Sequence, residues 1–327
     1  MRLGDTYDEV ASHVGLEPLK RFKDAGTFEI HRSRIPTNLF KSIVQDMDIM
    51  LAQYGSPEEQ MTKEARSRFF SPIFNCLVAQ FTFALRNDPE TSIKGHYPTQ
   101  GGIEYLFKTY GAVAVLFIKM KHSMKSNEEC LKAIAQIIAE CSVFDLNNCH
   151  DNVSSPIHCI LSDGSVFEFF KYERMPKPTF LCGCFHGDPT HLKHGLHLPD
   201  FTMMETCLPF IVQLCWICKT IFDVMLSTHI AGLKAYRCNQ LEKEGKKEGL
   251  MKRSSIDGWD QAILSGKHAQ AMFQQAEGQH KEGNVDAADA TVDQGLLALK
   301  ESTGAVLTNY KSEYIMTGWD DNEVGKK

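Results

Sequence analysis

Apolar residues recur at the three-to-four-residue spacing of helices in several separated parts of the chain. In the segment 40–54, Phe40, Val44, Met47 and Leu51 follow this period, and a Gly-Ser-Pro sequence ends it. The helices predicted in this way are 40–54, 62–85, 127–146, 201–236, 259–279 and 285–302. Pro72 is expected to kink or split the second helix. The fourth is apolar on most sides, so we expect it to be buried over the core.

Between these helices the pattern changes to short runs of branched and aromatic residues, which favour strands. Asp163 and Gly164 stand between two such runs, and this pair is the strongest hairpin signal in the chain. The predicted strands are 92–97, 102–107, 112–120, the two runs beside the Asp-Gly pair, and 178–185. Helix, three strands, helix and further strands, in this order, predict an α/β core with a mixed sheet.

The same pattern divides the chain into four predicted parts. They are an N-terminal helical arm at 1–54, an α/β core with its covering helix at 55–237, a charged linker at 238–254, and a C-terminal αα-hairpin with a tail at 255–327. The linker is rich in charge and broken by glycines. The hairpin is expected to pack through small residues, listed here: Ala262, Ala269, Ala276, Ala287 and Ala288.

Composition and charge bear on the size of the core, the affinity for polyanions and the cellular location of the protein. The chain has 327 residues with 43% apolar content, enough for a sizeable core, and a net charge of −6, so affinity for polyanions would need a local basic patch. Its 11 cysteines are odd in number and mostly lie among apolar residues, as free thiols do in a reducing compartment. The N-terminus lacks an apolar signal segment, and the longest uncharged apolar run, 206–218, is too short to span a bilayer. We therefore expect an intracellular protein, nuclear or cytoplasmic, that is neither secreted nor membrane-bound.

The segment 101–121, GGIEYLFKTYGAVAVLFIKMK, carries the candidate site. With a turn at 109–111, antiparallel pairing would set Glu104 roughly opposite Phe117, and Lys119 and Lys121 would share one strand face. A carboxylate facing a lysine across a hairpin is typical of metal-dependent nucleases. The simpler interpretation is a charge pair on a solvent-exposed edge strand.

Four short matches, in order, resemble the PD-(D/E)XK, or restriction-endonuclease-like, nuclease superfamily, in the form common among uncharacterised fungal proteins. They are KEAR at 63–66, GGIEY at 101–105, VLFIKMK at 115–121, and AQIIAEC at 135–141 followed by the Asp-Gly hairpin. The helix within 221–236 and the C-terminal hairpin also look like the fungal versions. The resemblance implies a restriction-endonuclease-like mixed sheet flanked by helices, with a long apolar helix and a C-terminal helical hairpin.

The resemblance also implies hydrolysis of DNA or RNA phosphodiesters assisted by Mg²⁺ or Mn²⁺. Glu104 would be the metal carboxylate, Glu64 a further metal or supporting carboxylate, Lys121 the catalytic lysine, and Gln136 a supporting group. Glu64, at the start of a helix, would also suit the helix dipole without any such role.

Lys119 is the departure from this pattern, because it stands where the family has its second carboxylate. At a separation of about 4 Å and an effective dielectric constant near 20, each unit-charge interaction is worth roughly 4 kcal/mol, and a divalent ion would feel about twice that repulsion. A carboxylate from a neighbouring helix, Glu64 or Glu140, could restore the site. The sequence thus leaves two functions open: an active nuclease, or a catalytically inactive pseudo-nuclease that binds nucleic acid or, through its C-terminal hairpin, a protein.

Two further cysteine patterns suggest weaker hypotheses. Cysteines and histidines gather in the segment 182–197, at Cys182, Cys184, His186, His191, His194 and His197, but C-x-C spacing is less specific for zinc than C-x₂₋₄-C, and a polar covering loop is the simpler interpretation. Cys215 and Cys218 have C-x-x-C spacing inside an apolar helix, which favours a core position over redox chemistry.

Overall fold

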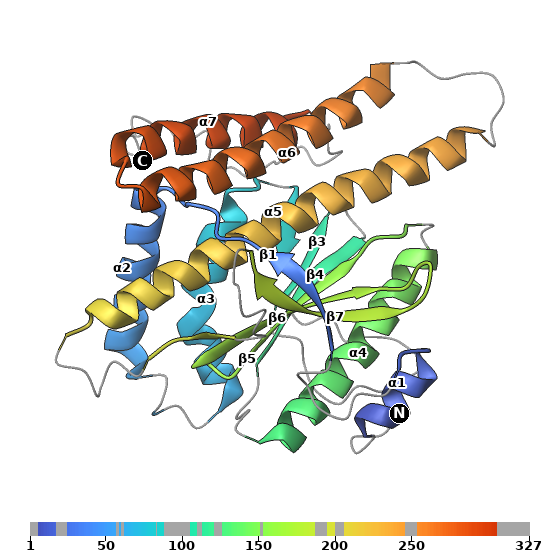
Figure 1. Ribbon diagram of the computed structural model, residues 1–327, viewed down its shortest axis with the longest axis horizontal. Coiled ribbons are helices and arrows are strands. Elements are labelled where there is room, and N and C mark those ends of the chain that lie inside the picture. Colours follow the sequence, from blue (N-terminus) through green and yellow to red (C-terminus); the bar gives the residue numbers. More distant parts are fainter. Residues whose placement is uncertain are drawn as a thin grey trace, which may run out of the picture.

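A single mixed sheet with helices on both faces organises the protein (Figure 1). The computed structural model describes residues 6–17, 25–56, 59, 62–82, 84–87, 105–109, 113–120, 126–150, 153–186, 195–199, 206–245 and 254–305. The α/β class and the mixed sheet predicted from the sequence are confirmed.

The sheet has eight strands in the order β1-β7-β6-β5-β4-β3-β2, and β8 pairs with β6 beside this path. Two neighbouring pairs, β1–β7 and β4–β5, are parallel, and the others are antiparallel. The strands are β1 Gly26–Ile30, β2 Leu85–Asn87, β3 Tyr105–Thr109, β4 Val113–Met120, β5 Ile157–Ser162, β6 Val166–Glu173, β7 Thr179–Phe185 and β8 Leu196–His197.

The centre of the chain follows the predicted order of elements. Helix α3 (Lys63–Ala79) leads to the antiparallel strands β2, β3 and β4, and α4 (Asn127–His150) then crosses over to β5, which lies parallel to β4. The Asp-Gly hairpin between β5 and β6 is confirmed: Gly164 has φ +92°, and Asp163 Oδ1 accepts the N–H of Ser165 and of Val166. Because Gly164 lacks a Cβ, it takes this left-handed conformation without strain.

The register of the first hairpin differs from the predicted one. Leu106, not Glu104, pairs with Phe117, and Tyr105 pairs with Ile118. The shift is two residues, so the assignment of side chains to faces is unchanged. A register shift between Phe107 and Lys108 adds an irregularity that composition cannot predict.

The predicted end of α3 is wrong, and of the kink or split predicted at Pro72 the split does not occur. The helix ends at Ala79 rather than near Leu85, and Leu85 begins the short strand β2. Pro72 does not split the helix. It has no N–H to donate to the carbonyl of Arg68 one turn earlier, and the hydroxyl of Ser71 donates to that carbonyl instead at 2.6 Å.

The N-terminal residues contribute one strand to the sheet and one helix to its cover. Helix α1 (Tyr7–His13) packs on α4, and β1 pairs in parallel with β7. Helix α2 (Thr37–Tyr54) is confirmed where it was predicted. Thus α1 and α4 cover one face of the sheet, and α2, α3 and α5 cover the other (Figure 1).

Helix α5 (Leu208–Gly245) is the long apolar helix, and it runs between the sheet and the C-terminal hairpin (Figure 1). Its segment Leu208–Asn239 is long and apolar enough to cross a bilayer, but 61% of its most apolar stretch is buried within the protein, as expected of a core helix. The first eight residues of the predicted linker, 238–245, are the last turns of α5, and residues 246–253 lie outside the described part.

The predicted C-terminal hairpin is confirmed as α6 (Ser254–Lys281) and α7 (Val285–Gly304). Four of the five predicted alanine contacts are buried, and Ala287 is exposed. The helices approach closely where Gly295 faces Phe273. The absence of a side chain at Gly295 allows this, since an added Cβ would lie 2.9 Å from the Phe273 ring. His229 of α5 meets Ser302 of α7 at 2.9 Å, and Ser302 donates to the carbonyl of Ala262, so the histidine Nε2 must carry the proton.

Candidate functional site

Lys119 on β4 forms a buried ion pair with α4. Its side chain is 2% exposed, and its Nζ donates to Glu140 Oε1 at 2.7 Å. Glu140 is fully buried, and the amide of Gln136, one turn earlier on α4, donates to the same oxygen at 3.3 Å. Residues four apart lie on one helix face, so α4 presents both side chains to β4 together. Sequence reasoning thus named three residues that the fold brings into contact.

This ion pair changes the electrostatic expectation for the site. Lys119 was expected to place an unbalanced positive charge where a metal carboxylate is needed. Instead, Glu140 balances that charge within the fold. The carboxylate that could have restored a metal site is therefore used to stabilise the lysine, because a buried ammonium without a partner is very costly.

The other predicted site residues lie wholly or in their side chains outside the described part of the chain. Glu104 and Lys121 lie outside the described residues. Glu64 is the second residue of α3, whose first turn is capped by Thr62 through the N–H of Ala65 at 3.2 Å, and its side chain is likewise outside the described part. The expected approach of Glu104 to Lys121 therefore remains a prediction.

Glu168 on β6 was missed by sequence reasoning. The pairing of Lys119 with Leu161 and of Leu161 with Glu168 puts these three residues in one row across the sheet, on the face that α4 covers. Desolvation, and then the charge of Asp163, raise the pKa of Glu168 to about 7. The available signal was a glutamate alternating with buried aromatic residues in the run VFEFF.

The described residues around Lys119 do not fit a Mg²⁺ ion. Mg²⁺ needs near-octahedral oxygen ligands and usually keeps several waters. Glu140 is fully buried, and one of its oxygens is held by an ammonium and an amide. Glu168 lies two strands away, at about twice the 4.8 Å spacing of neighbouring strands. The described part of the predicted site is thus a structural ion pair.

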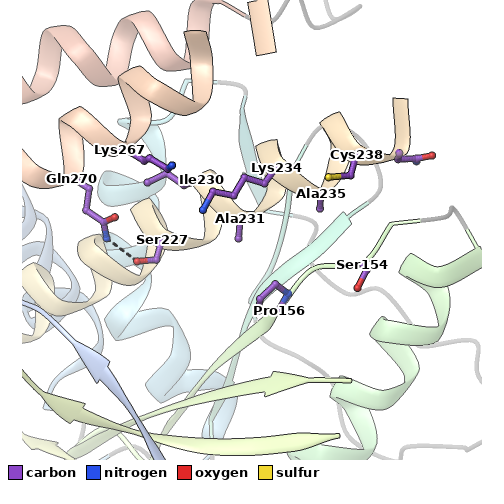
Figure 2. A pocket seen from close by; sticks show the side chains of 11 residues that line it. Ser154, Pro156, Ser227, Ile230, Ala231, Lys234, Ala235, Cys238, Lys267 and Gln270 are labelled. Atoms are coloured by element: carbon purple, nitrogen blue, oxygen red, sulfur yellow. Dashed lines mark hydrogen bonds between the residues drawn. The ribbon is translucent and has the colours of Figure 1, made fainter. Parts of the chain in front are cut away.

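A second feature is a cavity of about 650 Å³ between α5, α6 and the residues before β5 (Figure 2). Lys234 and Lys267 line it, and Gln270 Nε2 donates to Ser227 Oγ at 2.8 Å on its wall. Two ammonium groups in a partly apolar hollow suit a small anionic molecule.

The residues of the two predicted cysteine patterns lie in different places in the structure. Cys182 and Cys184 are buried in β7, His197 lies on the short strand β8, and His191 and His194 lie outside the described residues. Cys218 is buried in α5 beside Cys215, and burial raises the pKa of both thiols, as expected for core cysteines. His186 instead lies near Glu29 of β1 and His31, the residue that follows this strand.

Comparison with known proteins adds no relative: no family model, no curated protein and no solved structure matches this chain.

Proposed function

We propose that the protein is a nuclease-like protein in which the site between β4 and α4 has lost hydrolysis, and that it binds nucleic acid without cleaving it. The observation that carries this proposal is the buried pair of Lys119 and Glu140, because Lys119 stands where the resemblance to the superfamily implies the second metal carboxylate. The order α3, β2, β3, β4, α4, β5 supports the nuclease-like origin, because it agrees with the order of the four matches to the PD-(D/E)XK superfamily.

The alternative is an active nuclease that uses Mg²⁺ or Mn²⁺. The presence of Glu104 and Lys121 in the sequence favours it, since they match the remaining carboxylate and the catalytic lysine of the superfamily. Binding of a protein partner is the other ligand class, and the exposed apolar residues Leu264 and Leu297 on the C-terminal hairpin favour it.

Incubation of the full chain with single- and double-stranded DNA and RNA, with Mg²⁺ or Mn²⁺, separates these functions. We expect no cleavage, and binding that weakens steeply with salt because it depends on phosphate contacts. Lys121→Ala should weaken that binding, whereas Lys132→Ala, an exposed lysine paired with Glu128 on α4, should not. Cleavage by the wild type that Glu104→Ala and Lys121→Ala both abolish would establish the active nuclease. Absence of both cleavage and binding would overturn the proposal and leave a protein partner.

A further inference from the structure

Three potential metal ligands meet where β1 and β7 end, far along the sheet from β4. The two strands are parallel, with Glu29 paired to Cys184 and Ile30 to Phe185, and the N–H of His186 continues the ladder to the carbonyl of Ile30 at 2.9 Å. Side chains alternate between the faces of a strand, so Glu29, His31 and His186 project on the same side. Two strands held by backbone hydrogen bonds therefore position the set.

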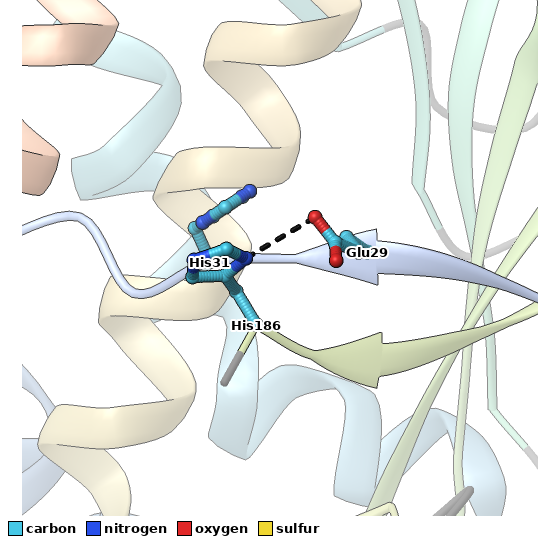
Figure 3. Close-up of side chains that lie close together, drawn as sticks. All are labelled: Glu29, His31 and His186. Atoms are coloured by element: carbon cyan, nitrogen blue, oxygen red, sulfur yellow. Dashed lines mark hydrogen bonds and ion pairs between the residues drawn. The ribbon is translucent and has the colours of Figure 1, made fainter. Parts of the chain in front are cut away.

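The distances within this set approach those of a coordination sphere. Glu29 Oε2 lies 3.2 Å from His186 Nδ1, and the rings of His31 and His186 are 4.7 Å apart with a tilt of 32° (Figure 3). One ligand atom from each residue lies within 4.8 Å of the others. Ligand atoms around a tetrahedral zinc ion, with bonds of 2.0–2.1 Å, are about 3.3 Å apart. The carboxylate and one imidazole already have this spacing, and a small side-chain rotation would bring in the second imidazole.

The surroundings leave room for such a rotation and for a further ligand. Glu29 and His186 are 64% and 62% exposed, so their side chains turn at little cost. A cavity of about 320 Å³ adjoins His31 and His186 and reaches Gln274 and Lys281 on α6. The neighbouring Arg32 is held away from the ligands, because its guanidinium lies between the rings of Phe185 and Trp216, 4.5 Å from each centroid.

We propose that Glu29, His31 and His186 bind one divalent transition-metal ion, with Zn²⁺ the best match. Two imidazoles and a carboxylate favour zinc over Mg²⁺, which prefers oxygen ligands. Three protein ligands with an open position are the pattern of zinc sites that keep a water, rather than of closed structural sites. The cavity beside His31 and His186 also contains Lys281, whose ammonium would favour an anionic group bound to the metal. This site is independent of the proposed function at β4 and α4.

Titration of the metal-free full chain with Zn²⁺, in competition with a chromophoric chelator, tests the proposal. We expect one zinc ion per chain, and at least about 100-fold weaker binding for His31→Ala, His186→Ala and Glu29→Gln, since each removes a direct ligand and outer-shell losses alone already cost 10–100-fold. His197→Ala, which removes an exposed histidine on β8, is the matched control and should bind zinc as the wild type does. Zinc should also raise the melting temperature of the wild type and of this control, but not that of the three ligand variants.

X-ray absorption at the zinc edge distinguishes zinc bound at the proposed site from zinc bound to any of the 11 cysteines. Nitrogen and oxygen neighbours near 2.0–2.1 Å support the site, whereas a sulfur neighbour near 2.3 Å overturns it. Absence of stoichiometric binding by the wild type overturns it as well. If all three ligand variants bind zinc as tightly as the wild type, the proposal is also overturned. Circular dichroism of the zinc-free variants shows whether they are folded.

Discussion

Two buried lysine–glutamate ion pairs each join two elements of this protein. Their nitrogen–oxygen distances are almost the same, but the groups around them differ. Lys119 and Glu140 join β4 to α4 at 2.7 Å, and Lys219 and Glu277 join α5 to α6 at 2.6 Å. The first pair lies where the sequence predicts a catalytic site, and the second lies in the helical layer. A short, buried ion pair is therefore not in itself a mark of an active site.

The surroundings of the two pairs differ more than the pairs do. Glu140 is fully buried and has Gln136 as its neutral donor. Glu277 lines a cavity and has a second cation near it, since Lys281 Nζ lies 4.0 Å from its other oxygen. The helix-side carboxylate thus has a second lysine within 4.0 Å and a cavity beside it, whereas the sheet-side carboxylate is fully buried. This asymmetry gives three predictions.

Replacement of Lys119 has the largest expected effect. Lys119→Met should lower the free energy of unfolding by about 3–5 kcal/mol, because it removes the ammonium that donates to the fully buried Glu140 carboxylate at 2.7 Å. Urea denaturation measures this loss. The double variant Lys119→Met/Glu140→Leu should recover most of the stability, since it removes both charges from the core. A loss below about 1 kcal/mol in the single variant would show that Glu140 is compensated elsewhere.

Glu168 gives the sheet side a pH dependence of intermediate size. Its pKa is raised from 4.5 to about 7, so the folded state holds a proton that the unfolded state has released. Its contribution to stability is therefore present below pH 4.5 and is lost as the pH rises through 7, by about 3 kcal/mol in all. Unfolding free energies measured between pH 4.5 and 8 should show this fall in the wild type relative to Glu168→Gln.

The opposite pH trend would contradict the assignment to Glu168. His229 provides an internal reference, because burial lowers its pKa to about 4 and its contribution to stability is lost as the pH falls below 6.5. That loss is common to the wild type and to Glu168→Gln. The difference between the two proteins therefore isolates the glutamate.

Replacement of Lys219 should have the smallest effect. Lys219→Met is expected to cost about 1–2 kcal/mol, less than the 3–5 kcal/mol typical of a broken buried pair, because Lys281 and water from the cavity still reach Glu277. Urea denaturation beside Lys119→Met makes the comparison direct. Equal losses in the two variants would remove the distinction between the pairs, and Lys219→Met/Lys281→Met should then be no worse than Lys219→Met alone.

Much of the fold follows from local pattern. The helices α2, α4, α6 and α7, and the Asp163–Gly164 hairpin, were predicted close to where they lie, because periodicity and turn chemistry are properties of neighbouring residues. The end of α3 and the strand β2 were not, because a three-residue strand has too few residues to show a period. Strand β1 was also missed. It is short, and its pairing partner β7 follows about 150 residues later, so the local sequence does not show the pairing.

The candidate sites divide in the same way. The resemblance to the PD-(D/E)XK superfamily placed Lys119 and Gln136 at one site and suggested Glu140 as a replacement carboxylate, and the structure brings these three residues together. The sequence did not reveal whether Lys119 would stand alone or be paired, because burial and partner depend on how α4 lies on the sheet. Nor did it join Glu29 to His186, 157 residues apart. Periodicity is a property of residues that are close in sequence. A balanced pair of charges or a set of metal ligands depends on side chains that come together only after the chain has folded.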